Sequence, residues 1–72
     1  MNTMRYGIVI EKGADNCSAY VPDLPGCIAT GSTLEQTKER IREAIQTHLD
    51  GMREDGTSAP VPTTVCDWID IA

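Results

Sequence analysis

Three cysteines and one histidine are the side chains of this sequence best suited to nucleophilic or metal chemistry. Cys17, Cys27 and Cys66 form no Cys-x-x-Cys pair, and His48 is the only histidine, so the ligand spacing of a zinc site is absent. A general base at His48 would need a nucleophile or substrate beside it, and no serine motif or second histidine supplies one. We expect no metal, no cofactor and no catalytic residue, with Cys17 and Cys27 as small strand residues.

The charge of the chain bears on its partners. The formal net charge is −5, and the six basic residues are scattered and partly interleaved with glutamates. Nucleic-acid binding needs clustered Lys and Arg against phosphates, so we expect no direct contact with nucleic acid. An acidic chain fits a basic protein partner better, although plain solubility explains the same charge.

A chain of 72 residues has room for one domain, predicted over residues 1–72. Its own core would rarely supply more than about 3–5 kcal/mol, and disulfides, metals or oligomerisation often add to that. No signal peptide or apolar run of ~20 residues is visible, so we expect a cytoplasmic protein with reduced thiols and no membrane contact. Oligomerisation, as a dimer or tetramer, is then the expected further source of stability.

Hydrophobic patterning predicts three strands, at residues 4–12, 17–21 and 27–30. The first has an apolar centre on both faces, which indicates burial on both sides. Between the second and third strands, Pro25 presets the backbone for a turn and Gly26 can adopt the positive φ that a type II turn needs.

A helix is predicted from Ser32, which would cap it in a box with Glu35. Apolar residues then recur on one helical face, at Leu34, Ile41, Ala44, Ile45, Leu49 and Met52. Gly51 could end the helix, but we favour continuation to about Asp55 with Gly56 in the left-handed conformation. A final strand is predicted at residues 65–71.

The expected fold is α+β, with order β-β-β-α-β. Strands one to three would form an antiparallel meander, and the fourth would lie parallel to the first in a four-stranded mixed sheet, joined by a right-handed crossover. One long helix would cover one face and leave the other for a partner.

The run from Ala19 to Cys27, with its Pro-Asp-Leu-Pro-Gly centre, resembles HicB-type antitoxin domains, as do Ile10-Glu11-Lys12 and the helix end from Gly51 to Gly56. The resemblance covers residues 4–72 and implies a partial ribonuclease-H-like fold. It also implies a partner, a small basic RNA-cleaving toxin (HicA) whose active site such proteins cover. Many members carry a further DNA-binding segment, which we do not expect here.

Four residues are predicted to contact such a partner: Glu11, Tyr20, Asp23 and Leu24. Glu11 and Asp23, with Asp15, would supply acidic contacts, although solvated turns explain them equally well. Tyr20 and Leu24 would be apolar anchors, whereas Trp68 fits core or dimer packing better. A stand-alone homo-oligomer without a toxin is the alternative function. Metal-dependent nuclease activity is disfavoured because strand one offers only Glu11 near its end, and fold alone does not imply function.

Overall fold

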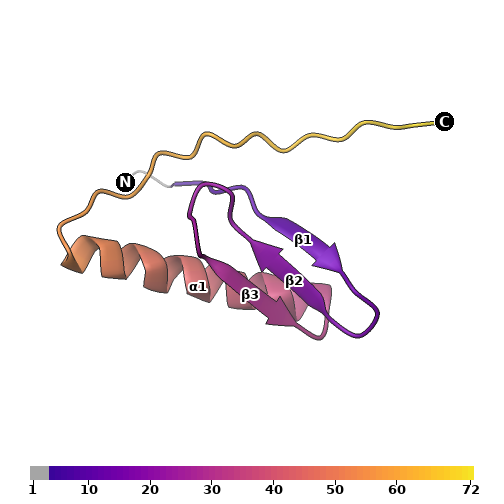
Figure 1. The fold of residues 1–72 in the computed structure, drawn as a ribbon, viewed down its shortest axis with the longest axis horizontal. Coiled ribbons are helices and arrows are strands. Elements are labelled where there is room, and N and C mark those ends of the chain that lie inside the picture. The colour runs from indigo at the N-terminus through magenta and orange to yellow at the C-terminus, as the bar shows by residue number, and fades with distance from the viewer. Residues whose placement is uncertain (1–3) are drawn as a thin grey trace.

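The computed structural model of the chain describes residues 4–72, which form three strands followed by one long helix (Figure 1). The strands are β1 (Val9–Lys12), β2 (Cys17–Tyr20) and β3 (Ile28–Gly31), and the helix is α1 (Leu34–Glu54). The predicted α+β class and the single long helix are confirmed. The predicted first strand begins at Val9 rather than at residue 4.

The sheet is the expected antiparallel meander, in the order β1-β2-β3. Ala19 pairs with Ile10 on one side and with Ala29 on the other. The connection from β2 to β3 folds back on itself, since the Leu24 amide donates to the Val21 carbonyl and the Val21 amide to the Cys27 carbonyl. Gly26 has a φ of 82°, as its place after Pro25 predicted.

The N-terminus of α1 is capped one residue later than predicted. Thr33 is the N-cap and its hydroxyl accepts from the Gln36 amide at 3.0 Å, while the Gln36 side chain accepts from the Ser32 amide at 2.6 Å. Thr33 and Gln36 have the same chemistry and spacing as Ser32 and Glu35, so the sequence alone does not separate the two boxes. At the other end, Gly51 lies inside the helix, Asp55 caps it and Gly56 has a φ of 74°, as favoured.

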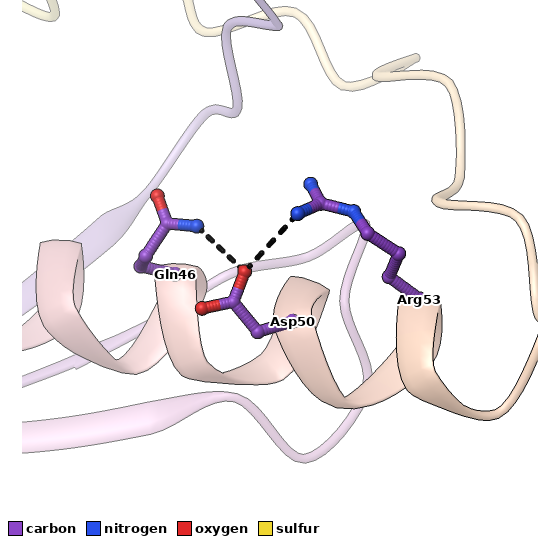
Figure 2. Close-up of polar contacts among 3 residues, drawn as sticks. All are labelled: Gln46, Asp50 and Arg53. Carbon is purple, nitrogen blue, oxygen red and sulfur yellow. Dashed lines mark hydrogen bonds and ion pairs between the residues drawn. The ribbon is translucent and has the colours of Figure 1, made fainter.

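The solvent side of α1 is polar and joined by local contacts in its last turns. Gln46 donates to a carboxylate oxygen of Asp50 at 3.0 Å, and the Arg53 guanidinium lies 3.6 Å from the same oxygen (Figure 2). These pairs are exposed, so each adds little to stability. They mark the face of the helix that points away from the core.

The core lies between α1 and one face of the sheet. Its buried residues are Ala19, Val21, Leu24, Cys27 and Ile41. The helix packs mainly against β3 and β2, and no element of residues 4–72 lies over the opposite face (Figure 1). Leu34, predicted in the apolar stripe, is substantially exposed at the first helical position.

The closest approach of helix to sheet is at Gly31, the last residue of β3. Thr37 is fully buried there, and its hydroxyl donates to the Thr33 carbonyl at 2.7 Å. A Cβ added to Gly31 would lie 2.6 Å from the Thr37 hydroxyl and 2.8 Å from the Thr37 backbone nitrogen. A side chain at residue 31 would therefore push the helix start off the sheet.

The C-terminal segment, residues 65–71, is not a strand of this sheet, so the predicted fourth strand beside β1 is wrong for the single chain. Within residues 4–72, no backbone hydrogen bond joins it to β1. Hydrogen bonds to Asp23 fix Thr63 and Thr64 immediately before this segment, and no ladder to β1 forms after them. Trp68 is 91% exposed, so it is not a core residue of its own chain.

Just before this segment, the chain is tied to the body by Asp23. Its carboxylate accepts hydrogen bonds from the amides and hydroxyls of Thr63 and Thr64, at 2.9–3.2 Å. The Tyr6 hydroxyl donates to the Pro60 carbonyl at 2.6 Å. We call the four bonds to Asp23 the Asp23 tether.

Replacing Gly31 by alanine should destabilise the fold by about 1–3 kcal/mol, because the added methyl group meets helix backbone. The matched control is Gly51→Ala. No atom lies within 4 Å of a Cβ there, so this change should stabilise the helix by about 1 kcal/mol. Urea unfolding followed by circular dichroism measures both, and equal effects of the two variants would contradict the close approach.

The Asp23 tether should respond to acid. Burial acts to raise the pKa of the Asp23 carboxyl, but the hydrogen bonds from Thr64 and Thr63 outweigh it, so the pKa lies below its ordinary value of 3.8. Because the pKa of Asp23 is lowered in the folded state, the stability that the tether contributes is fully present above pH 3.8. It is lost as the pH falls through the lowered pKa of the folded state. NMR titration of the Thr63 and Thr64 amides should show a midpoint below 3.8. Asp23→Asn should abolish that titration, and a midpoint above 3.8 in the wild type would refute the tether.

Candidate protein-interaction site

The side of the sheet opposite α1 is the candidate site. In a strand, successive side chains point to opposite faces. Cys17 and Ala19 of β2 are buried on the helix side, so Ser18 and Tyr20 point away from it. The strand register places further residues beside them, and the resulting open face consists of Val9, Glu11, Ser18, Tyr20, Ile28 and Thr30.

The open face has two rows that cross the three strands. Tyr20 lies between Val9 and Ile28 as directly paired neighbours, which makes one row apolar. Directly opposite residues have Cβ atoms about 4.5–5.5 Å apart, so these side chains form a continuous patch. Tyr20 is 42% exposed and Ile28 69% exposed. An exposed tyrosine beside an exposed isoleucine is the kind of surface that anchors a protein partner.

The second row is polar. Ser18 lies between Glu11 of β1 and Thr30 of β3. Glu11 is exposed, so its carboxylate adds a negative charge at the border of the apolar row. A partner fitted to this surface would carry an apolar pocket next to a basic group.

The structure brings together two of the four predicted contact residues. Glu11 and Tyr20 both lie on the open face, on neighbouring strands. Leu24 is fully buried in the core, which removes it from the surface contacts expected of it. It was predicted to be an apolar anchor for a partner, but the turn folds inward between Val21 and Cys27.

Asp23 has a structural task in the chain. Both oxygens of its carboxylate already accept hydrogen bonds from Thr63 and Thr64. An acidic contact with a partner would compete with those four bonds. The next residue, Leu24, is buried in the core. The loop between β2 and β3 therefore contributes to the core through Leu24 and binds residues 63–64 through Asp23.

The two residues that flank Tyr20 in the apolar row, Val9 and Ile28, were not predicted as contact residues. They were assigned to strands, but their place beside Tyr20 depends on the register between strands. The available signal was the two-residue period itself, since Ile28 and Thr30 alternate with the inward Cys27 and Ala29.

Two observations bear on the predicted lack of nucleophilic and metal chemistry. Burial raises the pKa of the Cys27 thiol, which favours the neutral form, whereas a nucleophilic cysteine needs a lowered pKa. In residues 4–72, no group of three His, Cys, Asp or Glu side chains is placed to hold a metal ion. The same residues contain no helix with the length and apolarity to cross a bilayer. The geometry of the open face suits binding.

Comparison with known proteins gives relatives of two kinds. A protein of Haemophilus phage HP1, described as an uncharacterized 14.9 kDa protein in the rep-hol intergenic region, is 39% identical over 66 residues, covering 92% of this chain and 50% of the phage protein. A UPF0150 protein of Archaeoglobus fulgidus is 41% identical over 56 residues, covering 74% of this chain and 81% of the relative. The chain thus spans half the length of the phage relative.

A solved structure shares the fold. A chain of a HicA3 and HicB3 toxin–antitoxin complex superposes with a TM-score of 0.70 at 28% identity, covering 83% of this chain and 70% of that one. The family model described as the HicB-like antitoxin of bacterial toxin–antitoxin systems matches residues 6–71. With nearly the whole sequence matched, the chain belongs to the HicB-like antitoxin family.

Proposed function

We propose that this chain is an antitoxin-type binding module that inhibits a small, basic, HicA-like RNA-cleaving toxin by covering its active site. Family membership and the similarity to a chain of a toxin–antitoxin complex support the antitoxin role. The observation that carries the proposed mode of binding is the open face, where Tyr20 and Ile28 are exposed beside Glu11.

The apolar row would supply the affinity. Aromatic side chains that enter a pocket of a partner dominate many interfaces, and neighbouring contacts exclude water around them. Tyr20 sits at the centre of its row, with Val9 and Ile28 as directly paired neighbours. Side chains on both sides restrict the freedom of a ring before it binds, and an anchor restricted in this way loses less entropy on binding.

The charge would supply speed and selectivity. A chain of net charge −5 attracts a basic protein over distances of about a Debye length, and such steering raises the association rate more than the affinity. A toxin that binds RNA needs a positive surface for phosphates, and the same surface would be attracted to this chain. The inhibition is steric and electrostatic, and the antitoxin performs no chemistry.

Truncating the anchor should release the toxin. With the product of a small basic neighbouring gene as partner, Tyr20→Ala should weaken the complex at least about tenfold, measured by calorimetry and by the return of RNA cleavage. Val61→Ala is the control, because Val61 is also a large apolar side chain with substantial exposure but lies outside the open face. A complex that tolerates Tyr20→Ala as well as Val61→Ala would refute the open face as the interface.

Removing the acidic border should change the rate of binding. Glu11→Gln should lower the association rate several-fold at low salt and make it less dependent on salt, with a smaller effect on dissociation. Glu39→Gln changes the net charge equally but on the solvent side of α1, so it separates local from global charge. Stopped-flow or surface-plasmon kinetics would show the difference. If no neighbouring product binds and the chain only self-associates, a stand-alone homo-oligomer becomes the better account.

A further inference from the structure

The C-terminal segment carries four large apolar side chains that are almost fully exposed. Val65, Trp68, Ile69 and Ile71 are each between 84% and 91% exposed. In Figure 1 the segment, drawn in yellow, leaves the region of β1 and projects beyond the body of the domain. Four nearly bare hydrophobic residues within seven positions are far more than scattered surface exposure accounts for, and such patches mark interfaces.

The edge of β1 is the second uncovered feature. The strand order places β1 at the edge of the sheet, where no strand of residues 4–72 pairs with its outer side. An unpaired edge presents amides and carbonyls that accept another strand. Beside this edge lies a hollow, lined on one side by Ile8, Ile10 and Lys12 and on the other by Val65 and Trp68.

We propose that two copies of this chain exchange their C-terminal segments, so that residues 65–71 of each copy pair with the β1 edge of the other. Each copy carries one segment to donate and one edge to accept it. A two-fold axis therefore satisfies both copies at once and closes the assembly as a dimer. Each sheet then gains a fourth strand that comes from the partner.

The start of the segment is fixed on its own body. The Asp23 tether fixes Thr63 and Thr64, and Cys66 lies so close to Gly7 that a Cβ added to Gly7 would lie 2.9 Å from the Cys66 sulfur. Beyond that contact, no backbone hydrogen bond joins the segment to β1, and the hollow lies between Trp68 and the strand. The β1 edge of each copy is therefore open to a strand of another copy.

Length fits the exchange. Seven extended residues span about 23 Å, enough to cover the about 13 Å of the four-residue β1 and the apolar stretch before it. The segment carries Asp67 and Asp70, whereas β1 carries one acidic and one basic residue, Glu11 and Lys12, so apolar burial and backbone pairing would have to supply the stability of the pair.

The area is of the right size. A buried tryptophan removes about 150–250 Å² from water, and the exchange would bury two of them. Three further aliphatic side chains join from each copy, which brings the total toward the about 1,200–2,000 Å² of a stable interface. The proposal concerns association of the chain with itself and stands whether or not it inhibits a toxin.

The mass of the full chain in solution is the first test. Native mass spectrometry and light scattering should give twice 7.8 kDa at micromolar concentration. Ile69→Asp should weaken the dimer at least about tenfold by placing a charge in the pairing strand, whereas Val61→Asp, an equally exposed apolar position outside the segment, should not. Trp68 is the only tryptophan, so its emission should shift to the blue as the dimer forms.

The path of the segment is tested separately. In a sample mixed from isotope-labelled and unlabelled copies, filtered NOE spectra should show contacts between the Trp68 indole and the Ile8 and Ile10 methyl groups of the other copy. A monomer at all concentrations, a dimer unaffected by Ile69→Asp, or Trp68 contacts to β1 of the same chain only would each overturn the exchange. Circular dichroism of Ile69→Asp confirms that the helix is retained.

Discussion

A three-stranded sheet has two faces, and the single helix of this chain covers one of them. The remaining architecture depends on that imbalance. Side chains toward α1 make the core, and side chains away from it form a surface with an apolar row. Burial on one face is sufficient to fold a domain of this size, while the other face stays available to a partner. The face available for binding exists because the fold has only two layers, one sheet and one helix.

Close contact between β3 and the start of α1 sets the position of the helix. Gly31 has no side chain, and Thr37 uses the space where one would be. Because Thr37 also bonds to the Thr33 carbonyl, its hydroxyl is satisfied although it is fully buried. The helix is therefore fixed in register with the strand, and the strands keep the pairing that aligns Val9, Tyr20 and Ile28.

Local patterns predicted much of this fold. The meander, the continuous helix through Gly51 and the positive φ of Gly26 and Gly56 all follow from short-range chemistry. The helix cap was misplaced by one residue because Ser32-Thr33 and Glu35-Gln36 offer two overlapping boxes. Leu24 was predicted to be an apolar anchor of an interface, whereas the turn that carries it folds back through Val21 and Cys27 and buries it in the core.

The prediction of a fourth strand was wrong for a different reason. Residues 65–71 have strand composition, but within residues 4–72 they pair with no strand, although the outer edge of β1 is free. Composition predicts that a segment can form a strand and does not identify the strand with which it pairs. The residues of the open face were likewise only partly predicted from the sequence, because the apolar row depends on how the strands pair. Tyr20 was predicted as a contact residue because it is aromatic. Val9 and Ile28 were recognised only from the register that places them beside it.

The order of the chain has a consequence for its folding. Within residues 4–72, every buried residue lies between Cys17 and Ile41, and the helix that covers them ends at Glu54. Contacts between elements close in sequence form quickly, so the core should assemble early and from one continuous stretch of chain. Residues 65–71 contribute no buried side chain, so this segment can exchange one neighbour for another while the core stays folded.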